Sequence, residues 1–176
     1  MRDKVAIDTG EAFWTFSVGL YAQKDVESEL LALQDRDGLE VNLALFCLFA
    51  GRQGYQLDNA AVQAMRAVGL AWGRQVVAPL RDARRNMKAN AQTDETIAGL
   101  RNEVKALELA AEKAMQMALA DLLVTLDTCR VPNADSEGEA KALAARNFAA
   151  WFAAEGVDGD APRHSVVKLL DAAFAV

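Results

Sequence analysis

The chain has 176 residues, of which 52% are hydrophobic and 25% charged, and its formal net charge at pH 7 is −6. That length fits one domain whose core needs no disulfide or metal, and the composition excludes disordered and collagen-like proteins. Residues 1–5 lead into no uncharged signal-peptide core, and no apolar stretch is long enough to span a membrane, so we expect a cytoplasmic protein.

Apolar residues recur at helical spacing along almost the whole chain. Together with capping residues, glycines and prolines, this spacing predicts helices over residues 10–22, 26–37, 40–51, 59–77, 78–90, 94–130, 135–155 and 163–174. We therefore predict an all-α fold, a single-domain bundle of seven or eight helices. Its main part is expected over residues 10–130, with residues 133–176 as a C-terminal helical extension packed on it.

Several residues mark the expected helix ends. Asp8, Asp25 and Asp58 are placed to cap the helices that follow them, and Gly38 is placed to end the second helix. Pro79 has no backbone N–H to donate, so the sequence predicts a kink or break at this point of the fourth and fifth helices.

Two of the predicted helices stand out. The segment 40–51 is apolar on nearly every side and is expected to be the central, most buried element. The segment 94–130 keeps one apolar face over roughly 50 Å, which predicts one long bundle helix. Its alanine-rich seam also suits packing against a second copy of the chain, so homo-oligomerisation through this helix is left open.

Catalytic and metal-binding templates are missing from the sequence. There is no GxSxG, P-loop or GxGxxG motif, and the single histidine, His164, lies in a polar turn. Cys47 and Cys129 occupy apolar stretches and are interpreted as buried free thiols. We expect no catalytic residue, no metal and no cofactor, and the sequence favours a non-enzymatic protein without deciding the question.

One carboxylate pair has the i, i+4 spacing that a helical metal site would use. Glu108 and Glu112 are flanked by Lys105 and Lys113, a pattern typical of a solvated helix face with ion pairs. We therefore interpret this pair as exposed and structural.

Positive charge is concentrated in the middle of the chain. Residues 58–92 carry a net charge of +4, whereas residues 1–53 carry −4 and residues 93–176 carry −6. Four of these cations fall at i, i+3, i+4 and i+7 on one helix face: Arg81, Arg84, Arg85 and Lys88. They either pair with acids of the chain itself or bind an acidic protein or an anionic small molecule. Nucleic acid is disfavoured because the whole protein is acidic.

A polar group in the apolar segment 40–51 is a second candidate site. Asn42 is flanked by apolar residues and is expected to be buried, where its amide must find partners. It either bonds a helix end or Asp35 to fix the packing, or lines a polar ligand pocket together with Gln34 and Asp35.

The aromatic residues of the first helix suggest a third site. Phe13 and Phe16 fall on the expected core stripe, whereas Trp14 lies off it. Trp14 either packs in a helix seam or anchors an interface from an exposed position.

Several spaced motifs resemble a family of small proteobacterial proteins of unknown function. The motifs are F-W-x-F-S from residue 13, L-Q-D-x-x-G-x-x-V-N from residue 33 and P-L-R-x-x-R from residue 79, and the resemblance spans roughly residues 13–90. It implies a bacterial cytoplasmic protein and carries no activity. Its motifs include Trp14, Gln34, Asp35, Asn42, Arg81 and Arg84.

The leading functional hypothesis is a helical adaptor or regulator that docks an acidic partner through Arg81, Arg84, Arg85 and Lys88. The alternative is a binding protein or enzyme for an anionic small molecule. That site would use Gln34, Asp35 and Asn42, with Arg81 or Arg84 anchoring the anion.

Overall fold

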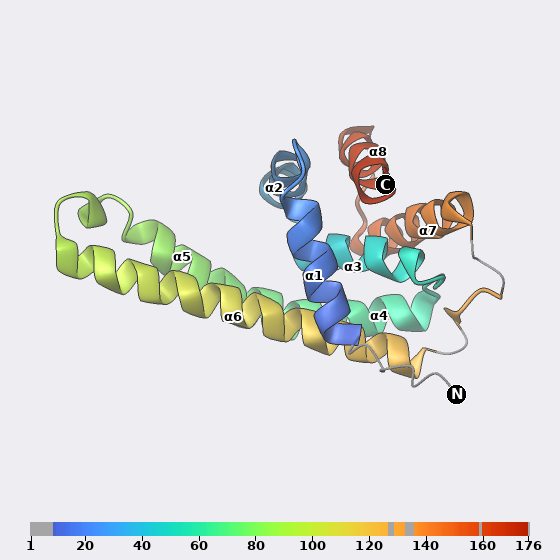
Figure 1. Ribbon diagram of the computed structural model, residues 1–176, viewed down its shortest axis with the longest axis horizontal. Helices are drawn as coiled ribbons and strands as arrows, with labels where there is room; N and C mark the ends of the chain where they lie inside the picture. The colour runs from blue at the N-terminus through green and yellow to red at the C-terminus, as the bar shows by residue number, and fades with distance from the viewer. Residues whose placement is uncertain (1–8, 127–128, 133–135, 159, 176) are drawn as a thin grey trace, which may run out of the picture.

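The computed structural model describes residues 9–126, 129–132, 136–158 and 160–175, and its helices pack as a single all-α body (Figure 1). The helices are α1 (Thr9–Tyr21), α2 (Val26–Asp37), α3 (Val41–Arg52), α4 (Asn59–Val68), the π-helix η1 (Gly69–Val77), α5 (Ala78–Asn86), the 3₁₀-helix η2 (Asn90–Gln92), α6 (Glu95–Thr125), α7 (Glu137–Glu155) and α8 (Asp160–Ala173). The all-α prediction with one long helix is confirmed.

Helix α3 lies at the centre of the core, as predicted. Every residue from Val41 to Gly51 is buried, because this segment is apolar on all sides and can satisfy its backbone only as a helix surrounded by others. Phe13 of α1 stacks on Phe49 with a ring-centre distance of 4.8 Å and meets the edge of Phe46 at 5.9 Å. These contacts fix α1 against the centre of the core.

The C-terminal helices belong to the same core. Helix α7 runs along α3, and its buried Asn147 accepts a hydrogen bond from the Leu57 N–H at 2.8 Å and donates to the Tyr55 carbonyl at 3.1 Å. Helix α8 packs beside α2 and also contacts α7 (Figure 1). The loop before α4 is therefore held by a side chain about ninety positions later in the sequence.

A helical arm projects from this body. We call the arm α5, η2 and the part of α6 that packs against them (Figure 1). The sequence predicts a kink or break at Pro79, but the chain stays helical through α4, η1 and α5, with a π-helical segment before the proline. The wider turns of η1 directly precede Pro79, which then falls in the first turn of α5, where no N–H donor is needed.

The expected helix ends are only partly right. Asp58 caps α4 by accepting from the Ala61 N–H at 2.8 Å, and Gly38 ends α2 with a left-handed φ of 67°, both as predicted. Asp25 precedes α2 but makes no side-chain cap bond, because its backbone adopts a left-handed φ of 66°; its carbonyl instead accepts from the Ser28 hydroxyl. Asp8 lies outside the described residues.

Two helices are shorter than predicted. Helix α6 ends at Thr125, so it has 31 residues and does not include Cys129, and α5 ends at Asn86. Both cysteines are buried and free, as expected. Within the described ranges, no helix combines the length and the apolar character that crossing a membrane requires.

Gly51 allows α3 and α7 to approach closely. A Cβ at this position would lie 2.6 Å from the Cα of Ala144, and it would also overlap the Ala144 backbone nitrogen. We expect Gly51→Ala to lower the free energy of unfolding by about 1–3 kcal/mol, because neither helix backbone can move without disturbing the core. Urea denaturation measures this change.

Gly99→Ala is the matched control, since Gly99 is exposed on α6 and a methyl group added there would meet nothing within 4 Å. Helix propensity alone should then raise stability by about 0.5–1 kcal/mol. Equal effects of the two substitutions would contradict the close approach of α3 and α7.

Candidate functional site

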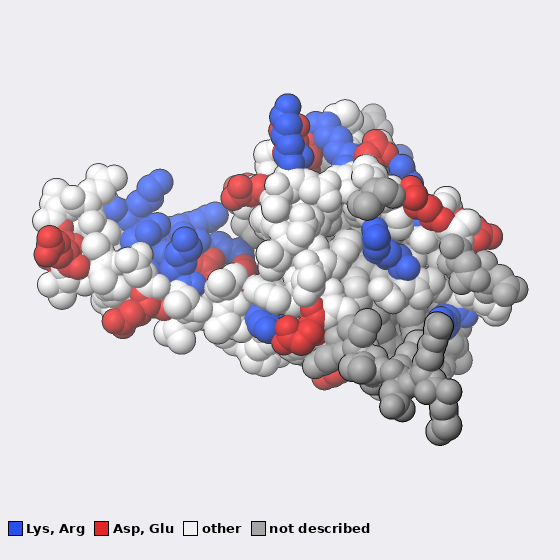
Figure 2. Space-filling view, viewed as in Figure 1, with Lys and Arg blue, Asp and Glu red and all other residues white. Residues whose placement is uncertain are grey.

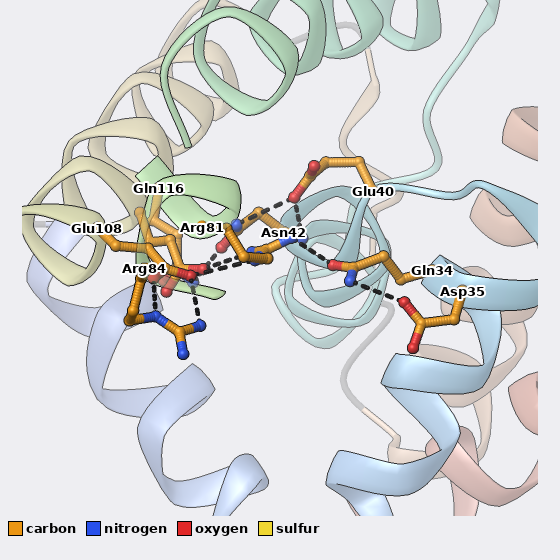
Figure 3. Close-up of polar contacts among 9 residues, drawn as sticks. Gln34, Asp35, Glu40, Asn42, Arg81, Arg84, Glu108 and Gln116 are labelled. Atoms are coloured by element: carbon orange, nitrogen blue, oxygen red, sulfur yellow. Dashed lines mark hydrogen bonds and ion pairs between the residues drawn. The ribbon is translucent and has the colours of Figure 1, made fainter. Parts of the chain in front are cut away.

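Arg81 joins three elements of the structure through charged and polar contacts (Figure 3). From α5 its guanidinium donates to Glu108 Oε1 at 3.1 Å and to Glu112 Oε1 at 2.9 Å on α6. It also donates to Gln34 Oε1 on α2 at 2.6 Å. Arg84, one turn along α5, donates to both carboxylate oxygens of Glu108. Arg81 therefore links the arm to the body, and Glu108 holds both arginines.

The interpretation of Glu108 and Glu112 as a solvated pair is wrong. The Glu108 side chain is only 7% exposed and faces α5, and both carboxylates pair with arginines instead of neighbouring lysines. Lys113 reaches Glu11 of α1 at 2.8 Å. The sequence spacing shows which residues share a face of α6, but not that α5 covers that face with guanidinium groups.

Burial and the arginines shift the two carboxylates in opposite directions. Burial alone would raise the pKa of Glu108, but the hydrogen bonds from Arg84 and Arg81 outweigh it and hold this pKa below its ordinary value. Burial raises the pKa of Glu112, and Arg81 offsets only part of this increase. Glu108 is therefore stabilised as a carboxylate, whereas Glu112 is the less stable charge of the pair.

Asn42 is buried, as predicted, and forms a chain of polar contacts with Glu40 and Gln116. Its Nδ2 donates to Glu40 Oε1 at 3.2 Å, and its Oδ1 accepts from Gln116 Nε2 at 2.9 Å. Glu40 also caps α3 by accepting from the Asn42 N–H. Asp35 takes no part in this chain: it is exposed, and its carboxylate accepts from Gln34 at 3.3 Å.

A cleft of about 650 Å³ lies where the arm meets the body. It is lined by the junction of α2 and α3, by α4, η1 and α5, and by the end of α7. Lys and Arg side chains gather along α5 beside this cleft (Figure 2). Arg74 and Arg85 line it and are exposed, and the exposed Lys88 follows Arg85 by one turn.

A second cavity, of about 280 Å³, lies between α1, α3 and α6. Its walls combine apolar side chains with Ser17, Asn42, Glu112 and Gln116. Trp14 also lines it, half-buried, with the Lys113 ammonium 5.8 Å from the ring centre.

The structure thus divides the residues that the sequence singled out. Gln34, Arg81 and Arg84 share one network of hydrogen bonds and ion pairs. The hydrogen-bonded residues Glu40, Asn42 and Gln116 lie next to this network (Figure 3). Other members lie elsewhere: Arg85 in the cleft wall, Lys88 in the turn after α5, Asp35 on the surface and Trp14 at the second cavity. Sequence reasoning missed Ser17, Glu40 and Gln116; a signal for Gln116 was its i+4 spacing from Glu112.

These observations define an all-α protein with a buried arginine–carboxylate network, a basic cleft and a small polar cavity. The model of a family described as "protein of unknown function (DUF2390)" matches residues 12–119, so the chain belongs to this family. The resemblance to a family of unknown function is thereby confirmed. The matched segment runs from α1 into α6 and contains the whole charge network.

Comparison with curated proteins and with solved structures gives no match.

Removing the charge of Glu108 should destabilise the fold. Glu108→Gln leaves Arg81 and Arg84 without their shared carboxylate, and breaking such a buried pair costs about 3 kcal/mol of unfolding free energy. Glu103→Gln, on an exposed site of the same helix, is the control and should change stability by less than about 0.5 kcal/mol. Chemical denaturation at pH 7 compares them; equal stabilities would contradict the structural role of Glu108.

The pH dependence of stability should separate the two carboxylates. The folded-state pKa of Glu108 is lowered from an unfolded-state value near 4.5. Its contribution to the stability of the fold is therefore complete above pH 4.5 and is lost as the pH falls through the folded-state pKa. The folded-state pKa of Glu112 is instead raised. Its contribution to the stability of the fold is therefore complete below pH 4.5 and is lost as the pH rises through the folded-state pKa.

We therefore expect opposite changes in the pH profile when each is replaced by glutamine. Relative to the wild type, Glu108→Gln should lose less stability on acidification, and Glu112→Gln should lose more. Thermal unfolding from about pH 2.5 to pH 7 measures both, because the Glu108 contribution is lost below about pH 4.5, and parallel profiles for the two variants would contradict the assignment.

Proposed function

We propose that the protein is a non-enzymatic interaction protein that binds an acidic segment of a partner protein in the cleft between arm and body. Arg74 and Arg85, which line the cleft, would supply the main cationic contacts, and Lys88 follows them in the turn after α5. This proposal keeps the predicted acidic partner and moves the main contacts along the helix, since Arg81 and Arg84 are held by Glu108.

The proposal is supported by the difference between Arg81 and Arg84, which are paired with Glu108, and the exposed cations beside them. Among the described residues, Arg74, Arg85 and Lys88 have neither an ion pair nor a side-chain hydrogen bond, and all three are exposed. Guanidinium groups bind carboxylates through two parallel N–H donors, so a segment rich in Asp and Glu fits Arg74 and Arg85.

The acids that line the cleft do not pair with these arginines. Glu155 is paired with Arg66 at 2.7 Å, whereas Glu40 and Asp82 keep their charges in the cleft wall and, among the described residues, form no ion pair with Arg74 or Arg85. A short acidic segment is favoured over nucleic acid because a polyphosphate carries one charge per nucleotide along its whole length, so the net charge of −6 opposes it more strongly.

Reversing the unpaired arginines should abolish binding of an acidic peptide. The probe is a fluorescein-labelled peptide of alternating Glu and Gly residues, titrated by fluorescence anisotropy at low ionic strength and again at about 150 mM salt. The double variant Arg74→Glu/Arg85→Glu should bind at least about tenfold more weakly, because two charge-assisted contacts become repulsive.

The matched control is Lys24→Glu/Arg130→Glu, which changes the net charge equally at exposed cations outside the cleft. It should keep the peptide affinity within about twofold, apart from the screened effect of net charge. Equal losses in both double variants would contradict a local site. Tighter binding of single-stranded DNA than of the peptide would identify nucleic acid as the ligand.

Self-association through α6 stays a separate proposal. Leu100 and Leu107, two turns apart on one face of this helix, leave 51% and 59% of their surfaces exposed. Such a pair of apolar side chains favours contact with another helix. Light scattering of the purified protein measures the oligomeric state directly.

A further inference from the structure

The cavity between α1, α3 and α6 contains polar atoms that the protein itself does not satisfy. Ser17 and Gln116 both line it and are 3% and 2% exposed, respectively. The Ser17 hydroxyl and the Gln116 Oε1 are buried and have no hydrogen-bond partner among the described residues. Nearly all buried polar atoms in folded proteins are hydrogen-bonded, so two such atoms in one small cavity indicate a ligand.

The orientation of Gln116 is fixed by its neighbours. A carboxylate only accepts hydrogen bonds, so Asn42 must turn its NH₂ group toward Glu40 and its carbonyl oxygen toward Gln116. Gln116 must then offer its own NH₂ group to Asn42 (Figure 3). Its Oε1 is consequently the free atom, and the unpaired group in the cavity wall is an acceptor.

Glu112 adds a second acceptor to the same wall. Its Oε1 accepts from Arg81 at 2.9 Å, whereas no hydrogen bond is made by Oε2 among the described residues. The Ser17 hydroxyl can accept as well. A ligand that satisfies all three atoms must therefore carry several N–H or O–H donors on one small group.

The charge of the network indicates the sign of that group. Among the described residues, three carboxylates, Glu40, Glu108 and Glu112, interact with two guanidinium groups, Arg81 and Arg84. The cluster therefore has a net charge of −1, and a partly buried negative charge favours a cation beside it. An ammonium group provides one positive charge and three donors.

The rest of the cavity is mainly apolar and aromatic, with Tyr21 as a further polar side chain. Val18, Val41, Leu45 and Leu109 line it together with the ring of Trp14. The volume of about 280 Å³ accommodates roughly ten non-hydrogen atoms. An aromatic ring attached to a short chain fits these walls.

We propose that this cavity binds a small primary amine, with its ammonium group among Ser17, Glu112 and Gln116 and its apolar body against Trp14, Leu45 and Leu109. The site is separate from the basic cleft and takes a ligand of opposite charge. The protein would thus have a small-molecule site in addition to its proposed partner site.

The test compares three probes of similar size and different charge. Phenethylamine is cationic, 2-phenylethanol is neutral and phenylacetate is anionic. Binding is followed by isothermal titration calorimetry and by the NMR signal of the Trp14 indole N–H. We expect phenethylamine to bind at least about tenfold more tightly than either analogue, because only it satisfies the acceptors and the net negative charge.

Three variants locate the ammonium group. Glu112→Gln should weaken phenethylamine binding about tenfold or more, and Ser17→Ala, which changes no ion pair, should weaken it several-fold. Glu103→Gln removes an exposed carboxylate of the same helix and should leave binding unchanged. If Glu112→Gln does not fold, Ser17→Ala still decides the question.

The proposal is overturned if phenethylamine does not bind at millimolar concentration, if all three probes bind alike, or if Ser17→Ala and Glu112→Gln bind it as the wild type does. Arg74→Glu/Arg85→Glu should bind phenethylamine normally. This result separates failure of the cavity from failure of the cleft.

Discussion

The contact of Arg81 with Glu108, Glu112 and Gln34 is the constraint on which the placement of the arm depends. The arm is otherwise connected to the body mainly through α6, which continues from one into the other. Helix α5 itself has no fully buried residue. Apolar burial therefore does little to fix the position of α5. A guanidinium group with three partners on two other helices defines that position through direction as well as distance.

Such a network contributes less to stability than its hydrogen bonds suggest. Removing Glu108 from water opposes its ionisation, and much of the attraction from Arg81 and Arg84 goes to offset that cost. Its greater effect is on specificity, since another packing of α5 against α6 would leave a partly buried charge unpaired. The same requirement explains why two of the four clustered cations turn toward α6 while Arg85 and Lys88 remain in solvent.

The sequence predicts those parts of the fold that depend on local pattern. The apolar run of α3 indicates a central helix, and Asp58 and Gly38 mark helix ends because capping and left-handed backbone are local properties. Asp25 fails as a cap because the tight turn after α1 sets its backbone, which the residue type does not reveal. The π-helix before Pro79 likewise depends on how the fourth and fifth helices pack as one unit.

The candidate site shows the same limit more strongly. The spacing correctly places Arg81, Arg84 and Arg85 on one helix, whereas Lys88 lies in the turn that follows α5. The three arginines differ in their contacts because a helix face is wide and α6 covers only part of it. The burial of Asn42 follows from its apolar neighbours, whereas Glu40 and Gln116 become its partners only through tertiary contacts. Pattern identifies the helix that bears a charge, and packing decides whether that charge is available.

The cleft and the cavity are connected through a single ion pair. Arg81 lines the cleft, and its partner Glu112 lines the cavity, so the 2.9 Å contact between them lies between the two proposed sites. An ammonium group beside Glu112 would share the carboxylate that holds Arg81 and so weaken that contact. A freer Arg81 would add positive charge to the cleft and favour an acidic partner there. By thermodynamic linkage, an acidic segment that draws Arg81 toward the cleft would equally favour the amine.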